Sequence, residues 1–296
     1  MSWAAATRYP CATMRKAHLL MATMVTALAL VGGVSCTSPD GTTTAGPAED
    51  ATTAKADRLE QLFSGDMTVL DLTHALSPNS VYWPDPSGNP FKYEVRSTQP
   101  SGAVSMGAYS TPEHHGTHLD APIHFGDNVP SVDDLTPADL LGPAAVIDVS
   151  AQAAADPDYE LSRGDLLNWE NEHGHLPDGV IVLMYSGWSE KYADASAYRN
   201  EDDEGRMHFP GFSEEAARFL SEERNIRGIG VDTLSVDPGA ASGFPAHEAV
   251  NGNGKYHLEN VANVHLLPAA GAFLIIAPIK IEGGSGGQAR IFAILP

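Results

Sequence analysis

The fold and the chemistry of this chain are organised around the stretch EHHGTHLDAPIHF, residues 113–125. It holds four histidines and two carboxylates, and no other segment of the sequence concentrates possible metal ligands in this way. Imidazole nitrogen and carboxylate oxygen are ligands that zinc, manganese and iron take in proteins. His114, His118, Asp120 and His124 are therefore candidate metal ligands.

The same stretch contains two residues that interrupt regular structure, Gly116 and Pro122. They argue against a helix with histidines at i and i+4, and favour a strand that runs into a tight loop. Because side chains alternate along a strand, His114, His118 and Asp120 would lie on one face and converge without a special bend. A histidine-rich surface loop is the alternative interpretation.

The run from His114 to Phe125, with the pattern HxGTHxDAPxHF, resembles the signature of the metal-dependent cyclase family. That family includes bacterial kynurenine formamidases and isatin hydrolases. The resemblance implies an α/β fold, a single layered β/β/α domain with a mixed sheet, swivelling-domain-like rather than doubly wound. It also implies metal-dependent hydrolysis of a C–N amide bond, a formamide or a cyclic amide, in a small aromatic molecule.

Two later segments extend the resemblance. Residues 232–237, DTLSVD, are similar to a turn of the family, and the segment FPAH, residues 244–247, precedes Glu259. The resemblance implies that Glu259 binds the metal and that His247 transfers protons. Residues 258–261 also look locally helical, in which case Glu259 would be a solvated carboxylate.

Several features of the ion site stay open in the sequence. His124 can serve the same ion as the other ligands or a second ion. The donor set suits zinc as well as manganese, and one ion as well as two. Histidines without support from a motif are expected to be structural or exposed, and these are His173, His175, His208, His257 and His265.

An aromatic segment stiffened by proline, Tyr82-Trp83-Pro84, precedes the metal motif. Family members carry a comparable segment beside the pocket. Tyr82 and Trp83 are therefore candidate substrate-binding residues that stack on an aryl ring. Packing of Trp83 in the core is the alternative.

Strands and helices are predicted to alternate in the middle of the chain, which indicates an α/β domain. Polar segments that begin with Ser162 and Ser213 predict helices, since serine is a favoured N-cap. The apolar segment at residues 144–149 predicts a strand buried on both faces, and residues 179–185 give the strongest strand signal. Residues 226–231 are predicted to form the next strand.

The end of the chain is expected to form two strands, 271–281 and 289–295, joined by the glycine-rich segment EGGSGG, residues 282–287. The segment formally contains Gly-x-Ser-x-Gly. A nucleophile elbow requires a following helix, and none is predicted here. We therefore interpret the segment as a turn and exclude a serine-hydrolase nucleophile.

Residues 1–35 have the features of a secretory signal peptide, with Arg15 and Lys16 before an apolar run that ends in small residues. Met14 is the more natural start of such a signal, so residues 1–13 are interpreted as a misassigned extension. The segment GVSC that ends at Cys36 resembles a bacterial lipobox, in which Cys36 would be acylated. Ordinary cleavage and release is the alternative.

The predicted organisation after the signal is a flexible tether at residues 36–56 and a cyclase-family hydrolase domain at residues 57–296. The chain would then be a bacterial lipoprotein or secreted protein, extracytoplasmic, and in contact with a membrane only through a lipid anchor. The resemblance also implies a homo-oligomer, for which the polar excursion at residues 190–208 is a candidate contact.

Composition excludes several classes of protein. The two cysteines, Cys11 and Cys36, both precede the predicted domain, so a cysteine nucleophile, a cysteine zinc site and a disulfide framework are excluded there. The formal net charge of −21 repels phosphate backbones, and nucleic acid is not an expected partner. The expected partner is a small-molecule substrate.

Two other functions remain open. The same site could hydrolyse a lactone or another cyclic ester. Alternatively, a tethered lipoprotein could bind metal or a solute without turnover. A pure binder has no need of a proton-transferring His247, so this residue separates the two classes.

Overall fold

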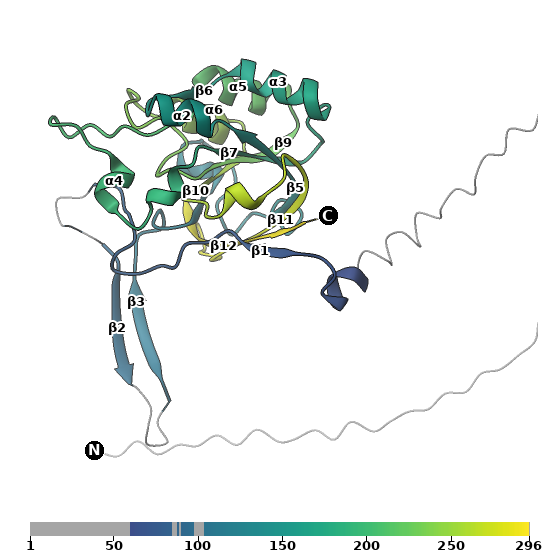
Figure 1. Cartoon of the computed structure of the whole chain (residues 1–296). Helices are drawn as coiled ribbons and strands as arrows, with labels where there is room; N and C mark the ends of the chain where they lie inside the picture. The colour runs from purple at the N-terminus through teal and green to yellow at the C-terminus, as the bar shows by residue number, and fades with distance from the viewer. Residues whose placement is uncertain (1–59, 85–87, 89, 98–103, 296) are drawn as a thin grey trace, which may run out of the picture. The chain divides into compact units, whose positions relative to one another are not determined.

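The computed structural model of this protein describes residues 60–84, 88, 90–97 and 104–295 (Figure 1). The predicted signal peptide, the tether and Cys36 lie outside the described residues and stay predictions. None of the helices in the described part of the chain has the length and hydropathy that a membrane span requires.

The centre of the domain is a mixed eight-stranded sheet with the strand order β1-β12-β11-β5-β7-β9-β10-β4. Strands β5, β7, β9 and β10 run parallel to one another, and the remaining pairs are antiparallel. The bounds are β1 Val69–Asp71, β4 His118–Asp120, β5 Leu141–Asp148, β7 Val180–Tyr185, β9 Ile226–Val231, β10 Tyr256–Glu259, β11 Ala270–Pro278 and β12 Gly286–Ile294.

The sheet closes on itself because β4 pairs with both β10 and β12. Gly286 of β12 lies opposite Asp120, while the far end of the same strand pairs with β1 through Ile294. The predicted mixed α/β fold is confirmed. Its closure into a barrel-like sheet is a finding that the strand pattern alone did not predict, since it depends on one short strand bridging two partners.

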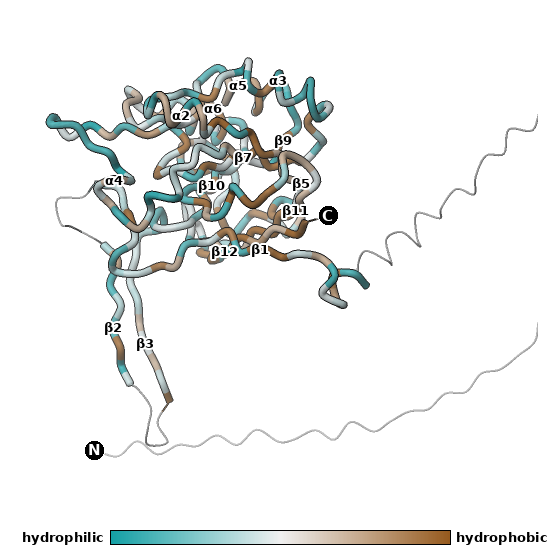
Figure 2. The backbone as a smooth tube through the Cα atoms, viewed as in Figure 1, coloured by the Kyte–Doolittle hydropathy of each residue, from teal (hydrophilic) through white to brown (hydrophobic). Residues whose placement is uncertain are grey.

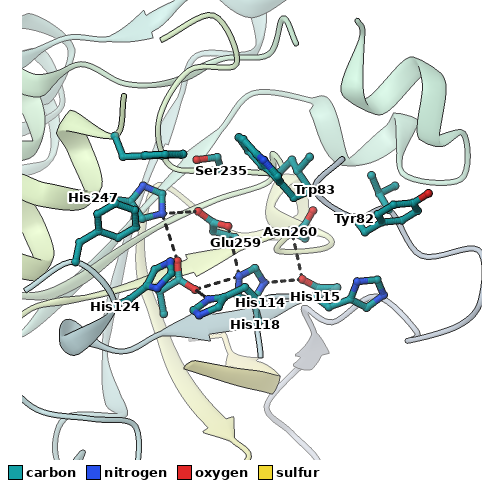
Figure 3. Close-up of a pocket in the computed structure, with 16 residues that line it drawn as sticks. Tyr82, Trp83, His114, His115, His118, His124, Ser235, His247, Glu259 and Asn260 are labelled. Atoms are coloured by element: carbon teal, nitrogen blue, oxygen red, sulfur yellow. Dashed lines mark hydrogen bonds and ion pairs between the residues drawn. The ribbon is translucent and has the colours of Figure 1, made fainter. Parts of the chain in front are cut away.

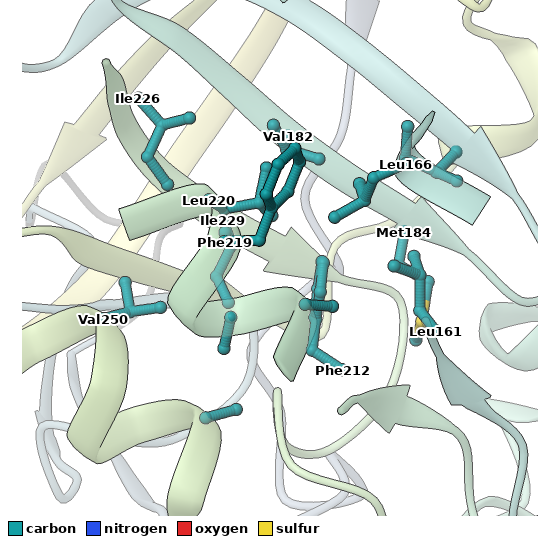
Figure 4. Close-up of a cluster of buried hydrophobic side chains, with 14 of the residues drawn as sticks. Leu161, Leu166, Val182, Met184, Phe212, Phe219, Leu220, Ile226, Ile229 and Val250 are labelled. Carbon is teal, nitrogen blue, oxygen red and sulfur yellow. The ribbon is translucent and has the colours of Figure 1, made fainter. Parts of the chain in front are cut away.

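The two faces of the parallel strands bury different cores. In β7, Val182 and Met184 pack against the helices, whereas Ile181 and Leu183 face the interior of the closed sheet. All four are fully buried. This double burial explains why the strand has a continuous apolar sequence instead of an alternating one. Figure 4 shows the helix-side cluster.

The helices that cover the outer face are α2 (Ser150–Ala155), α3 (Arg163–His173), α5 (Glu214–Glu223) and α6 (Pro245–Gly252). The predicted starts of two of them are confirmed. Ser162 caps α3 in a reciprocal capping box with Asp165, and Ser213 caps α5 by accepting a hydrogen bond from the backbone of Ala216.

Shorter elements complete the domain. They are the two-stranded pairs β2 (Lys92–Ser97) with β3 (Met106–Ser110) and β6 (Glu160–Leu161) with β8 (Gly211–Phe212), the helix α4 (Ala195–Arg199), and the 3₁₀ turns η1 (Pro122–His124), η2 (Trp188–Lys191) and η3 (Val264–Leu266).

The predicted polar excursion at residues 190–208 is largely exposed and is attached to the domain through Tyr198 and Met207, so its role as a subunit contact stays a prediction. Tyr198 is fully buried in a cluster that also contains Val81, Trp188 and Leu234. Exposed apolar side chains lie instead on the β2–β3 hairpin, where Figure 2 marks hydrophobic residues on both strands. They include Tyr93, Val95, Met106 and Tyr109, each more than half exposed.

Candidate metal centre and active site

The register between β4 and β10 builds the site. Glu259 lies opposite His118, and His257 lies opposite Asp120. Opposed residues on neighbouring strands share a face, as do residues i and i+2 of one strand. The four side chains therefore form one patch, in which none is more than 5% exposed. The alternative of a solvated helix carboxylate for Glu259 is wrong, because this residue ends a buried strand.

Asp120 and Glu259 both lie between His118 and His247. The Nε2 atom of His118 is 3.1 Å from Oδ1 of Asp120 and 3.4 Å from Oε2 of Glu259. The Nε2 atom of His247 is 3.4 Å from Oδ2 of Asp120 and 3.3 Å from Oε1 of Glu259. Each carboxylate thus turns one oxygen to each histidine. Figure 3 shows this arrangement for Glu259.

Two groups of ligand atoms form in the part of the chain that the structure describes. One contains His114, His118 and Asp120, and the other contains Asp120, His247 and His257. Within each group the ligand atoms lie within 4.8 Å of one another. Nε2 of His118 and Nδ1 of His257 lie near carboxylate oxygens, but neither they nor Nε2 of His257 have a partner with the geometry of a hydrogen bond, although all three atoms are buried. The residues therefore fit a divalent cation held by nitrogen and oxygen.

The electrostatics of the site also favour a cation. Burial opposes the charged form of His118, but attraction to Asp120 and Glu259 outweighs it and raises the pKa of His118 to about 9. Burial likewise opposes the charge on Asp120, yet the neighbouring histidines hold the pKa of this carboxyl well below its usual range. The buried carboxylates thus require positive charge beside them, which a divalent ion supplies.

In His118 and His247, the ring nitrogen Nδ1 points away from the two carboxylates and is held by a hydrogen bond to a neighbouring residue. Nδ1 of His118 is 2.8 Å from the carbonyl oxygen of Gly116, whose φ of +67° places this carbonyl in a conformation that favours glycine. Nδ1 of His247 is 2.6 Å from Asp237, which also accepts a 2.7 Å hydrogen bond from the backbone of Ala246. Such partners orient ligating imidazoles.

His124 lies beside the two groups but belongs to neither. It ends η1, directly after β4, and its ring stacks on that of His114 with centroids 3.9 Å apart. It lies 5.9 Å from the ring of His247. Burial lowers the pKa of His124 to about 4. The imidazole faces the pocket as a neutral group.

A cavity of about 240 Å³ opens onto these residues. Its wall is largely apolar and aromatic, and includes Tyr82, Trp83, Phe125 and Phe244. The ring of Trp83 lies 6.0 Å from that of Phe244, and Trp83 is 44% exposed. Trp83 therefore stands at the rim of the pocket and not in the core. The space suits a small aromatic molecule.

His257 is the site residue that the sequence did not single out. We expected a structural or exposed histidine, and the structure places it fully buried, with Nδ1 3.7 Å from Oδ2 of Asp120. Its alternation with Glu259 would have indicated a shared face, had residues 256–259 been recognised as a strand. Asp237 was noticed only as part of a turn motif.

Comparison with known proteins agrees with this fold and site. The family described as "Putative cyclase" matches residues 70–238. The chain belongs to this cyclase family.

Particular relatives are similar over most of the chain. An isatin hydrolase from Roseibium aggregatum is 36% identical over 255 residues, which cover 80% of this chain and 95% of the relative. A kynurenine formamidase from Bacillus cereus is 34% identical over 223 residues, covering 75% of this chain and 94% of the relative.

Solved structures show the same likeness. An isatin hydrolase bound to the product analogue thioisatinate superposes with a TM-score of 0.78 at 34% identity, covering 83% of this chain and 99% of that one. Isatin hydrolase A from Ralstonia solanacearum gives a TM-score of 0.76 at 38% identity, with coverages of 86% and 100%.

Proposed function

We propose that this protein is a metal-dependent hydrolase that cleaves the C–N amide bond of a small aromatic molecule. The observation that carries the proposal is the pair of buried carboxylates between His118 and His247, at the end of a pocket with aromatic walls. Relatives named isatin hydrolase and kynurenine formamidase support a cyclic amide or a formamide as the substrate.

The ion would be held by His114, His118, Asp120 and Glu259, with zinc and manganese as the candidates. A divalent ion supplies a bound water whose pKa falls from about 15.7 towards 7, together with positive charge beside the carbonyl. Because Asp120 and Glu259 each turn an oxygen to His247 as well, the same residues can hold a second ion.

Hydrolysis requires one proton to leave the attacking water and one to reach the departing nitrogen. The resemblance to the family implies that His247 transfers these protons, and the sequence makes His124 a candidate ligand. The geometry favours the reverse, with His247 as a metal ligand and His124 as the residue that transfers protons. Nδ1 of His247 is held by Asp237 while Nε2 points at two carboxylates, as in a ligand. The ring of His124 lines the pocket, and among the described residues no hydrogen bond holds either of its nitrogens in place.

Two variants separate these roles. If His247 is a ligand, His247→Ala lowers the bound metal, whereas His124→Asn keeps the metal and loses turnover. If the assignment from the sequence holds, His247→Ala keeps the metal and loses turnover. His175→Ala, at an exposed histidine, is the matched control and should change neither.

The function itself is tested on the purified protein by elemental analysis and by assays of isatin and N-formylkynurenine, with and without chelator. Bound zinc or manganese with chelator-sensitive hydrolysis of either compound supports the proposal. If metal is bound but neither compound is hydrolysed, the substrate would be a lactone or the protein would bind a solute without turnover. Absence of metal after reconstitution would refute the site.

We also propose an extracytoplasmic homo-oligomer, anchored through acylated Cys36 or released after cleavage of residues 1–35. Metabolic labelling with a radioactive fatty acid tests the anchor, with Cys36→Ser as the control. The exposed apolar residues of the β2–β3 hairpin support self-association. Light scattering measures the molar mass in solution of Val95→Asp and of the parent protein, and a lower mass for the variant is expected. An unchanged mass would show that the hairpin is not part of the interface.

A further inference from the structure

His114 connects the candidate ion site to the glycine-rich turn between β11 and β12. One ring nitrogen, Nδ1, lies 2.5 Å from Oδ1 of Asp120. The other, Nε2, lies 2.9 Å from the hydroxyl oxygen of Ser285. Because the two nitrogens point in opposite directions, only Nδ1 can face an ion that Asp120 also holds.

Ser285 is itself held by the residue that precedes His114. Its hydroxyl lies 2.5 Å from Oε2 of Glu113, and its backbone nitrogen lies 3.1 Å from the same oxygen. The carbonyl of Ser285 accepts a hydrogen bond from the backbone of Ala121. The serine is therefore fixed on both sides, and its hydroxyl has a defined position beside the histidine ring.

Glycine at position 286 makes this approach possible. A Cβ atom there would lie 2.7 Å from Cε1 of His114 and 2.6 Å from the carbonyl oxygen of Leu119. Both distances are shorter than a carbon contact allows, so a side chain would displace the histidine ring. The turn that formally matched Gly-x-Ser-x-Gly thus serves as a support for the ring.

The direction of each hydrogen bond follows from the chemistry of the groups. A carboxylate only accepts, so the hydroxyl of Ser285 donates to Glu113. The lone pair of that hydroxyl is then left for His114, and Nε2–H donates to it. We propose that Glu113 and Ser285 are positioning residues that hold one proton of His114 on Nε2, so that a divalent ion beside Asp120 takes the place of the proton that Nδ1 shares with this carboxylate.

This arrangement differs from that of the other two oriented histidines. His118 and His247 are each held through Nδ1 and face the carboxylates with Nε2. His114 is turned the other way and uses Nε2 for support. Its orientation therefore depends on a side-chain relay from a turn far away in the sequence. Loss of such a partner typically weakens metal binding about 10–100-fold.

The inference rests on the proposed ion site, and its test needs no substrate. Affinity of the metal-free full chain for Zn²⁺ is measured by competition with a chromophoric chelator. Ser285→Ala and Glu113→Gln should each weaken binding about 10–100-fold. Ser285→Thr, which keeps the hydroxyl, should bind like the parent. Unchanged affinity in both Ser285→Ala and Glu113→Gln would overturn the proposal.

Asp133→Ala is the matched control, because it loosens the turn at residues 282–287 without removing the hydrogen bond between Ser285 and His114. Asp133 accepts a 2.8 Å hydrogen bond from the backbone of Gly283 in the same turn but does not contact His114. Affinity close to that of the parent supports the relay. A loss as large as that of Ser285→Ala refutes it, because the effect would then come from the turn as a whole. If Ser285→Ala fails to fold, Glu113→Gln carries the comparison.

A spectroscopic readout tests the tautomer directly. In the Zn²⁺-loaded, ¹⁵N-labelled protein, the ring of His114 should show a protonated Nε2 and a metal-shifted Nδ1, assigned by comparison with His114→Gln. A protonated Nδ1 in the parent protein would refute the proposal. Hydrolytic activity does not enter either measurement, so the relay can fail while the proposed reaction stands.

Discussion

Replacing Glu170 with glutamine should destabilise the domain at neutral pH and much less at acidic pH. Glu170 lies in α3, with its side chain 9% exposed. It accepts hydrogen bonds of 2.8 and 2.7 Å from Nε and Nη2 of Arg224, which follows α5. It also accepts a 3.1 Å hydrogen bond from the backbone of Leu176. The substitution keeps the shape and removes the charge that joins the two helices.

The pKa of Glu170 sets the magnitude. Hydrogen bonds from Arg224 outweigh the effect of burial and lower this pKa from 4.5 to about 2. A depressed pKa in the folded state contributes stability above the unfolded value, and this contribution is lost as the pH falls through the folded value. By linkage, a shift of this size corresponds to about 3 kcal/mol at pH 7, and more than half of that is lost by about pH 3.

Urea denaturation of both proteins at pH 7 and at pH 3 measures the effect. The free-energy difference between parent and Glu170→Gln should shrink as the pH falls. Glu223→Gln is the control, because the ion pair of Glu223 with Arg163 is exposed and contributes about 0–1 kcal/mol. A difference that is small at pH 7, or that does not change with pH, would refute the reasoning.

Three further predictions concern the site. Removal of the metal should lower the midpoint of thermal unfolding, because an ion at a concentration of about 100 times its Kd stabilises the folded state by about 2.7 kcal/mol. A midpoint that does not change when chelator is added would contradict the ion site. Asp237→Asn keeps the size of the residue that orients His247 and should weaken metal binding about 10–100-fold, measured by chelator competition. Trp83→Leu should raise KM for an aromatic substrate about 2–10-fold, the equivalent of about 0.5–1.5 kcal/mol of ring stacking. Because Trp83 stands at the pocket rim, its replacement should leave the thermal midpoint unchanged, and a fall would place it in the core.

The sequence by itself determined the part of the site that lies on one strand. His118 and Asp120 lie two residues apart on β4, so the period of an extended backbone is enough to place them on one face. The expectation that His114 lies on the same strand is wrong: it precedes β4, and the bend at Gly116, with φ of +67°, brings it back to Asp120. The buried strands were equally visible, because β5, β7 and β9 bury both faces and are predominantly apolar. The resemblance of the motif to the cyclase family then added the fold and the class of reaction.

Only the tertiary structure decided which distant residues complete the site. Glu259 and His257 reach β4 through the register of β10, and Ser285 reaches His114 through the pairing of β12 with the same strand. Short-range periodicity determines which residues of a strand share a face. Register between strands far apart in the sequence is decided by the packing of the whole core, which no local pattern records.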